Sequence, residues 1–412
     1  MPTAPAYRPA LVSWNLTKKC NLRCPHCYME AGTRAARELT TDECLHLLDE
    51  LHGLGTEMLI LTGGEPLLRR DIYQIARAAS ERGIWVVMGT NGVLVNDHVA
   101  RKMVECGVKG VGISLDALDP ARHDAFRGGP DAWKYAVRAL DLCRRHGLEV
   151  LVQTTVMEEN LGEIPALLDF AKARGAWSFN LYFLVQTGRG QAMTELSPEA
   201  THETLSMLVD VQDAYRPMLV RSKCAPQFKQ IAYLRGRGGL ESGGCMAGTS
   251  YCRITPEGDV TPCPYMTATA GNVLDRSFTE IWERSPVFAD LRDPARLKGR
   301  CGVCEFKTLC GGCRCRAYAA TGDYLAEDPA CTYQPTGVPL DAATVLWSEA
   351  AQQRLDRIPI AFIREKVRAG VEAYARRQAA RLVTPELMDG ALNGMERPAA
   401  FSKLPSFVKR DA

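Results

Sequence analysis

The sequence has no long apolar run and almost no net charge. None of its apolar stretches approaches the roughly 20 residues that cross a bilayer. The first sixteen residues also lack the basic segment followed by an apolar segment that marks a secretory signal. The 50 Lys and Arg against 48 Asp and Glu leave a formal charge of +2. Bulk charge therefore gives no reason to expect binding to nucleic acid or to an anionic membrane. We predict a cytoplasmic protein without a membrane span.

Cysteine, by contrast, is abundant, with 16 in 412 residues. Disulfides are rare in the cytoplasm, where thiols are kept reduced. Metal binding therefore explains this many cysteines better than disulfides do.

Short apolar runs alternate with amphipathic helical stretches over the first half of the chain. The helical stretches carry the usual start and stop signals; TTDECLHLLDELHGLG begins with a Thr cap and stops at glycine. Six successive β–α units predict a parallel α/β sheet with ligands at the C-terminal ends of its strands. Because the strands read as apolar on both faces, we expect both faces to be covered. The predicted strands span 11–17, 58–62, 85–90, 110–116, 150–156 and 179–185.

The composition and the residue pattern of the sequence change near residue 235 and again after Pro335. The middle segment is rich in Gly, Cys and Arg. A segment of this kind cannot build a large hydrophobic core, so it needs another source of stability. The last part reads as two or three short helices broken by Pro359. We predict a core domain at 9–215, a Cys-rich domain at 216–335, a helical module at 340–397 and a poorly ordered tail at 398–412.

Three cysteines, Cys20, Cys24 and Cys27, lie in the loop after the first predicted strand, in CNLRCPHCY. Compact thiolate spacing of this kind suits a 4Fe–4S cluster with three irons held and the fourth open. The alternative is a structural zinc site completed by His26, which would need four closed ligands.

This loop resembles the CxxxCxxC signature of the radical S-adenosylmethionine (SAM) superfamily. Tyr28 matches the aromatic residue that usually follows the third cysteine, and the order of later motifs agrees. The resemblance covers residues 9 to about 215 and implies a partial (β/α)6 barrel. It also implies that SAM is cleaved at the open iron to give a 5′-deoxyadenosyl radical, with the three cysteines as the catalytic centre. The positions it implies for SAM binding are Gly63, Gly64, Glu65 and Pro66 in TGGEP, Asn91 in TNG, Ser114 and Asp116 in GISLDA, and the FLVQTGRG segment that contains Arg189.

The downstream cysteines resemble the SPASM extension of radical SAM enzymes, which carries up to two auxiliary 4Fe–4S clusters. Its pattern implies two ligand sets: Cys245, Cys252, Cys263 and Cys313 for one cluster, and Cys301, Cys304, Cys310 and Cys331 for the other. CGGCRC departs from the usual spacing, so Cys315 remains an alternative to Cys313. A pair of zinc ribbons is the other interpretation. Cys44, Cys106, Cys143 and Cys224 are predicted to be packing residues.

Two further resemblances point to a tetrapyrrole substrate. KGRCGVCEFKTLCGGCRC is similar to the branch that modifies tetrapyrrole side chains in haem and d1-type haem biosynthesis. The C-terminal helical segment resembles a module of light-independent protochlorophyllide reductase. We expect Arg189 to bind a propionate, an auxiliary cluster to accept an electron, and ferredoxin or flavodoxin to supply electrons.

Two other functions remain open. The first is modification of a ribosomal peptide, which the short segment before the first strand disfavours because many such enzymes carry an N-terminal peptide-binding domain. The second is a non-enzymatic iron–sulfur electron carrier, which would leave TGGEP unexplained.

Overall fold

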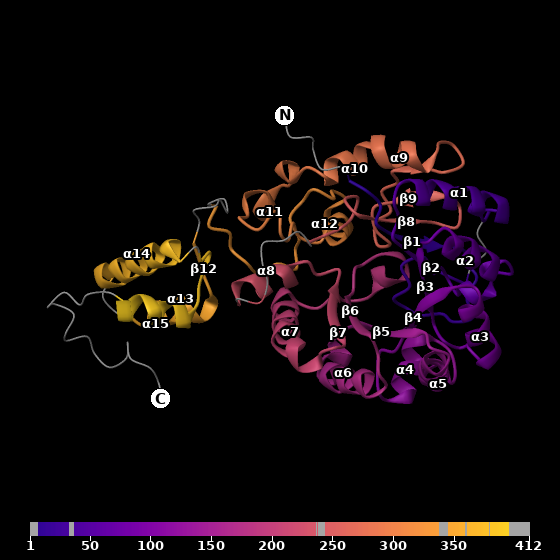
Figure 1. Ribbon diagram of the computed structural model, residues 1–412, viewed down its shortest axis with the longest axis horizontal. Helices are drawn as coiled ribbons and strands as arrows, with labels where there is room; N and C mark the ends of the chain where they lie inside the picture. The colour runs from indigo at the N-terminus through magenta and orange to yellow at the C-terminus, as the bar shows by residue number, and fades with distance from the viewer. Residues whose placement is uncertain are drawn as a thin grey trace.

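The computed structural model of the protein describes residues 7–32, 37–235, 237, 244–337, 345–358, 361–378 and 380–394. The tail predicted at 398–412 and the break at Pro359 lie outside the described residues. The main body is a curved sheet wrapped by helices, and a smaller helical module lies to one side of it (Figure 1). No helix in the described segments is long and apolar enough to cross a membrane.

All six predicted strands are present, and each pairs in parallel with the next. The α/β prediction is therefore confirmed. The sheet continues at both edges in the order β10-β9-β8-β1-β2-β3-β4-β5-β6-β7. Within the described segments the edge strands β7 and β10 do not pair, so the barrel is partial. The strands are β1 (Leu11–Asn15), β2 (Met58–Thr62), β3 (Trp85–Thr90), β4 (Val108–Ser114), β5 (Glu149–Val156), β6 (Ser178–Phe183), β7 (Leu219–Lys223), β8 (Tyr251–Ile254), β9 (Asp259–Thr261) and β10 (Gly271–Asn272).

Helices from the β–α units cover the outer face of the sheet (Figure 1). The first shows why the chain turns helical there: Thr40 and Glu43 form a reciprocal capping box, in which each side chain accepts the other residue's backbone N–H. The helices of this layer are α1 (Thr41–Gly53), α2 (Ile72–Glu81), α3 (Asp97–Glu105), α4 (Pro120–Arg127), α5 (Ala132–Arg145), α6 (Ile164–Ala173), α7 (Pro198–Val211) and α8 (Gln227–Leu234).

The main core lies between the outer face of the sheet and these helices. Val12 and Trp14 of β1 are completely buried in it. The next positions along the strands face inward, because side chains alternate along a strand. There the prediction of two apolar faces is wrong: Ser13, Ser114 and Gln153 line an inner cavity instead. The sheet is therefore apolar on its outer face and partly polar inside.

The Cys-rich segment does not form a separate sheet. Strand β8 pairs in parallel with β1, and β7 pairs with β6. The boundary predicted near residue 215 thus falls inside one continuous sheet. The segment also contains four short helices that the sequence pattern did not indicate: α9 (Phe278–Arg284), α10 (Pro286–Leu291), α11 (Gly299–Val303) and α12 (Arg314–Thr321).

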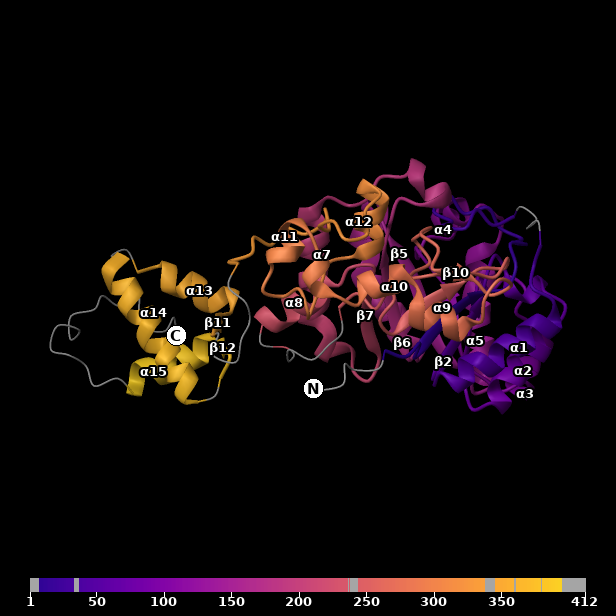
Figure 2. The ribbon, with the colours of Figure 1, turned by 90° about the horizontal axis from the view of Figure 1, so that it is seen from above.

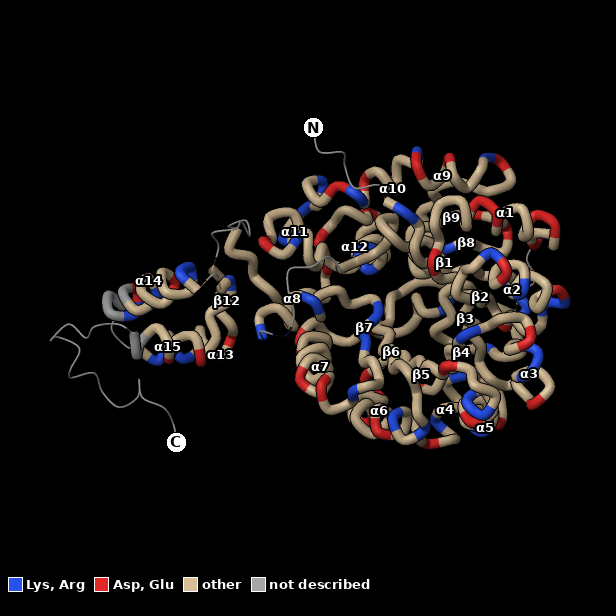
Figure 3. The backbone as a smooth tube through the Cα atoms, in the orientation of Figure 1, with Lys and Arg blue, Asp and Glu red and all other residues tan. Residues whose placement is uncertain are grey.

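The C-terminal module has a small hydrophobic core of its own that includes Leu355, Val371 and Val383. Three helices build it, as predicted, and it lies beside α8 and α11 (Figures 1 and 2). Basic and acidic residues are interspersed along the helices of both parts (Figure 3), in agreement with the small net charge. The elements of the module are β11 (Leu346–Trp347), α13 (Glu349–Asp356), α14 (Ala361–Arg377), β12 (Leu382–Val383) and α15 (Pro385–Gly394).

Candidate active site and cysteine clusters

Cys20, Cys24 and Cys27 line one cavity of about 220 Å³, together with residues from the C-terminal ends of the strands. The loop after β1 carries all three. Backbone N–H groups of the loop point at two of the sulfurs: Leu22 donates to Cys20 Sγ at 3.5 Å, and Ala31 donates to Cys27 Sγ at 3.3 Å. The structure therefore brings the predicted triad together around a shared space.

The side chain of His26, the alternative fourth ligand, makes an aromatic contact. Its ring stacks on Phe126, with centroids 4.3 Å apart and planes 8° apart. Burial and the positive charge of Arg127 lower the pKa of His26 to about 3, which keeps the ring neutral. A stacked aromatic role accounts for this side chain.

The TGGEP loop packs directly on the cysteine loop. Gly64 N–H donates to the Thr17 carbonyl at 2.7 Å, and Glu65 N–H donates to the Lys19 carbonyl at 2.8 Å. A Cβ on Gly64 would lie 2.2 Å from the Lys19 carbonyl oxygen, and one on Gly63 would lie 2.6 Å from that of Thr17. Glycine is therefore needed because two backbones meet here. The same two glycines line the cavity.

Glu65 does not face the cavity as we expected. Its carboxylate is completely buried and accepts hydrogen bonds from the Thr90 hydroxyl and from the backbone N–H groups of Asn91 and Leu67. Burial raises the pKa of Glu65 to about 7 despite these donors. Pro66, also buried, begins the short turn that follows. The carboxylate thus ties the TGGEP loop to the end of β3 and does not meet a ligand's ammonium group directly.

Of the polar residues predicted at the ends of β3 and β4, Asn91 and Ser114 line the cavity. Asp116 does not. Its buried carboxylate binds the guanidinium of Arg127 at 2.6 Å and accepts the Thr155 N–H at 2.8 Å. The resemblance implied SAM binding for Asp116, but the structure places this carboxylate on protein groups and outside the lining of the cavity. Arg127, which no sequence motif singled out, lines the cavity.

Arg189 lines the cavity, but its guanidinium is committed to the cysteine loop. Nε donates to the Cys24 carbonyl at 2.9 Å, and Nη1 donates to the Ala31 carbonyl at 2.7 Å. The Arg189 N–H also binds the Cys27 carbonyl. The expectation that Arg189 binds a substrate carboxylate is thus corrected: the side chain braces the loop that carries the triad.

Four tyrosines form one wall of the cavity: Tyr28, Tyr182, Tyr251 and Tyr265. The rings of Tyr28 and Tyr265 lie 5.1 Å apart, and the Tyr28 hydroxyl accepts a hydrogen bond from Asn15 at 2.8 Å. Only Tyr28 was predicted. Tyr182 and Tyr251 occupy inward positions of β6 and β8, so side-chain alternation would have found them once the inner face was known.

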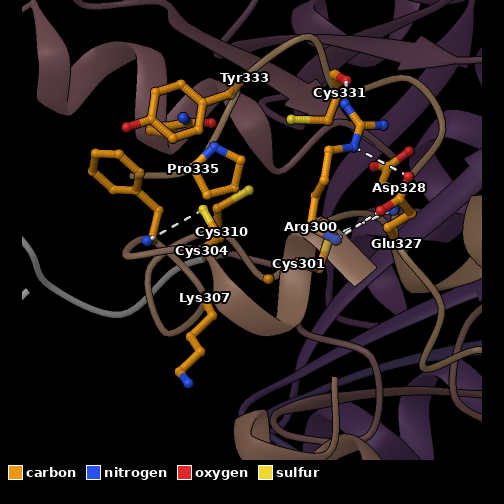
Figure 4. A pocket seen from close by; sticks show the side chains of 14 residues that line it. Arg300, Cys301, Cys304, Lys307, Cys310, Glu327, Asp328, Cys331, Tyr333 and Pro335 are labelled. Carbon is orange, nitrogen blue, oxygen red and sulfur yellow. Dashed lines mark hydrogen bonds and ion pairs between the residues drawn. The ribbon is translucent and has the colours of Figure 1, made fainter. Parts of the chain in front are cut away.

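A second group of cysteines matches one predicted ligand set in full. Cys301, Cys304, Cys310 and Cys331 line one small cavity, which is drawn in Figure 4. The Phe306 N–H donates to Cys304 Sγ at 3.4 Å and the Asp328 N–H to Cys301 Sγ at 3.5 Å. Four thiols that line one cavity, two of them with N–H groups at the sulfur, are donors of the type that can hold a four-cysteine iron–sulfur cluster.

A third group lies where α12 meets the ends of β6 and β7. Cys313 and Cys315 have their sulfurs 3.3 Å apart, and Cys224 and Cys263 pack against them. Cys245 interacts with Cys313 and Cys263. Cys224 was predicted to be a packing residue, and the structure packs its side chain both against the main core and against these thiols.

Cys252, predicted as a ligand of this group, lies elsewhere. It is completely buried in the main hydrophobic core. Burial raises the pKa of its thiol, and Arg292 is the charged neighbour that opposes this rise. The predictions for Cys44, Cys106 and Cys143 are confirmed, since these cysteines also lie in the main core.

Several thiols of the triad and of the second group have raised pKa values because they are buried. Burial raises the pKa of Cys20 to about 11, that of Cys304 to about 12 and that of Cys331 to about 11. These thiols are therefore protonated at neutral pH without a metal, and metal binding would release their protons. The three thiols of the triad can hold three irons. Backbone N–H groups point at two of the sulfurs, and the four tyrosines can exclude water from the cavity.

Three family models match parts of the chain. Residues 14–171 match the radical SAM superfamily, residues 245–314 match an iron–sulfur cluster-binding domain called SPASM, and residues 347–391 match the proto-chlorophyllide reductase 57 kD subunit.

Among curated proteins, an AdoMet-dependent heme synthase of Methanosarcina barkeri is 40% identical over 79% of this chain and 97% of its own length. A pre-heme d1 synthase of Dinoroseobacter shibae is 36% identical over 80% and 88%, respectively. A mycofactocin maturase, MftC, of Mycobacterium ulcerans is 32% identical over 80% and 89%.

Among solved structures, Streptococcus suis SuiB bound to SAM aligns with a TM-score of 0.67 at 17% identity, covering 79% of this chain and 78% of that one. At this identity the likeness shows the fold alone.

Proposed function

Because the chain belongs to the radical SAM superfamily and carries a SPASM iron–sulfur domain, we propose that it modifies the side chains of a tetrapyrrole. The chain is an enzyme whose cofactors are 4Fe–4S clusters and SAM. The observation that carries the proposal is the 40% identity to an AdoMet-dependent heme synthase along 97% of that protein. The match of residues 347–391 to a subunit of proto-chlorophyllide reductase, another protein named for a tetrapyrrole, supports it independently.

We propose Cys20, Cys24 and Cys27 as the ligands of the SAM-binding cluster. When bound, the cluster and SAM supply a 5′-deoxyadenosyl radical that removes a hydrogen atom from an unactivated carbon. Gly63, Gly64 and Asn91 would receive SAM, because they line the same cavity as the three thiols.

The other residues around this cavity fix the loop and limit access. Arg189 holds the cysteine loop by its carbonyls, and Glu65 holds the TGGEP loop. The tyrosine wall excludes water from the reacting carbon, which prevents quenching of a reactive intermediate.

The reaction class that fits a porphyrin is oxidative decarboxylation or removal of a propionate. Loss of one hydrogen atom and CO2 from a propionate leaves a vinyl group and releases one electron, which an auxiliary cluster would accept. Electrons would enter the enzyme from a small carrier such as ferredoxin or flavodoxin. We propose that a residue other than Arg189 binds the propionate, because Nε and Nη1 of Arg189 already donate to backbone carbonyls.

A direct test is anaerobic incubation of the purified enzyme with SAM, a reductant and either iron-coproporphyrin or didecarboxysirohaem, followed by mass spectrometry. We expect one tetrapyrrole to lose mass in step with 5′-deoxyadenosine formation, and the Cys24→Ala variant to leave both unchanged. If neither tetrapyrrole changes mass while SAM is cleaved, the substrate proposal fails and the radical SAM assignment stands.

A second candidate is modification of a ribosomal peptide. It is favoured by the 32% identity to a mycofactocin maturase over 80% of the chain. A mass change in a precursor peptide, with the tetrapyrroles unchanged in the same assay, would select this function.

A further inference from the structure

Five cysteines gather around the start of α12. Of these, the SPASM resemblance assigns only Cys245, Cys263 and either Cys313 or Cys315 to one cluster, together with Cys252. Cys313 and Cys315 are 3.3 Å apart at their sulfurs. Cys224 and Cys263 pack against this pair. Cys245 is buried close enough to Cys313 and Cys263 for their charges to affect one another's pKa. The group therefore contains Cys224 and lacks Cys252.

The direction of β8 explains why Cys252 is absent from this group. Cys252 pairs in register with Val12 of β1, and both side chains are fully buried in the main core. Its neighbour Tyr251 lies at an inward position and lines the inner cavity. Because successive side chains of a strand point to opposite faces, Cys252 faces the outer helices. A ligand role for Cys252 would require the strand to shift by one residue.

Cys224 is held in the group by an unusual backbone. It follows directly after β7 and has φ of +61°, in the left-handed region that residues other than glycine seldom occupy. Such a conformation persists where the surrounding structure fixes it, and it is found most often at functional sites. It turns the Cys224 side chain toward α12.

Arg316 of α12 is the group that fixes this backbone. Its guanidinium is 3% exposed. It donates to the Cys224 carbonyl at 2.7 Å, to the Leu184 carbonyl at 3.1 Å and to the Glu195 carboxylate at 2.7 Å. The end of β7 is thereby clamped to the helix that carries Cys315.

From this geometry we propose that Cys224 is a ligand of the first auxiliary cluster, in the place that sequence spacing assigns to Cys252. The cluster is then held by Cys224, Cys245 and Cys263, together with one thiol of the Cys313 and Cys315 pair. Each thiol loses its proton to solvent as its sulfur binds iron. This inference rests on the SPASM membership of the chain and is independent of the substrate.

The proposed ligand set also joins the two edge regions of the sheet. Cys224 directly follows the edge strand β7, whereas Cys263 follows β9, which lies near the opposite edge. The auxiliary cluster would then be bound by segments from both edges. Tyr182 of β6, which lines the cavity of the triad, is paired with Lys223 immediately before Cys224. The ligand set thus reaches the wall of the radical site.

The test compares two single substitutions in a background from which the triad has been removed. In a Cys20→Ala, Cys24→Ala, Cys27→Ala protein, the remaining clusters should give about eight irons per chain, four for each four-cysteine site. Cys224→Gly removes the thiol at a backbone angle that glycine adopts without strain. Cys252→Ala is the matched control, because it removes a buried thiol of the same domain.

We expect Cys252→Ala to keep the iron and sulfide content and the EPR spectrum of the background. We expect Cys224→Gly either to fall to about four irons or to show an altered EPR and Mössbauer signature from one cluster. If Cys224→Gly cannot be purified folded, Cys224→Ser decides the question by the same spectra. Unchanged iron content and spectra on substituting Cys224, or loss of a cluster in Cys252→Ala, would overturn the inference.

These measurements use no tetrapyrrole. Failure of the substrate proposal would therefore leave this result unaffected, and an unfavourable result here would leave the substrate proposal untouched.

Discussion

The carboxylate of Asp116 and the guanidinium of Arg127 form a buried ion pair in which Oδ2 lies 2.6 Å from both Nε and Nη2. Burial is the largest influence and would raise the pKa of Asp116, but the charge of Arg127 and the other groups around the carboxylate, among them the Thr155 N–H, together lower the pKa below its usual value. The Arg127 carbonyl in turn accepts the Cys24 thiol at 3.4 Å. The pair therefore connects the end of β4 to the cysteine loop.

Replacing Asp116 with Asn should destabilise the protein strongly, because it leaves the Arg127 charge buried without a counter-charge. Loss of one partner of a buried pair costs about 3–5 kcal/mol. Asp213→Asn is the matched control, since Asp213 pairs with Arg216 at the surface and such pairs contribute about 1 kcal/mol or less. Anaerobic urea unfolding measures both, and equal losses would show that the pair is not a buried support.

Cys24→Ala should abolish reductive cleavage of SAM, because the cluster would lose one of its three thiolates. The measurement is 5′-deoxyadenosine formed under anaerobic reduction. Cys143→Ala is the control: Cys143 lies in the main core, and burial raises its pKa to about 12. We expect that variant to cleave SAM at the wild-type rate. Cleavage by Cys24→Ala at that rate would contradict the site.

Gly64→Ala should weaken SAM binding, because its Cβ would lie 2.2 Å from the Lys19 carbonyl oxygen and the two loops would have to separate. We expect at least a tenfold rise in the dissociation constant for SAM, about 1.4 kcal/mol or more. Gly53→Ala is the control at the end of α1, where a Cβ meets no atom within 4 Å. Equal affinity of the two variants would show that the close packing is not needed for binding.

His123 should make the protein less stable as the pH falls from about 6.5 to about 4. Burial lowers the pKa of His123 from 6.5 to about 4, and its Nδ1 accepts the Asp116 N–H at 3.2 Å. Between these values the unfolded chain binds a proton that the folded chain excludes, so stability rises with pH across this window and is lost on acidification.

The matched variant is His123→Asn, which keeps an acceptor for the Asp116 N–H but does not titrate. We expect its melting temperature to fall less than that of the wild type between pH 7 and pH 5, both measured under anaerobic conditions. Parallel falls for the two proteins would assign the acid sensitivity to other groups.

The strands, the capped helices and the contiguous cysteine motifs could be predicted from the sequence alone. The alternation of apolar strands with capped helices predicted the parallel sheet, because the hydrophobic period follows directly from strand and helix geometry. Motifs of residues that are close in sequence also allowed groups of cysteines to be predicted. The triad of Cys20, Cys24 and Cys27 lies within one loop, and Cys301, Cys304 and Cys310 lie close in sequence.

Only the tertiary structure decided which side chains meet across long sequence distances. Asp116 and Glu65 are bound by protein groups, because Arg127 and the Thr90–Asn91 segment reach them from other elements. Cys252 faces the main core and Cys224 faces the other thiols. A one-residue change of position along a strand reverses the face of a side chain, and a single left-handed residue redirects a loop. Spacing in the sequence records neither, so the ligands of the third cysteine group had to be read from the fold.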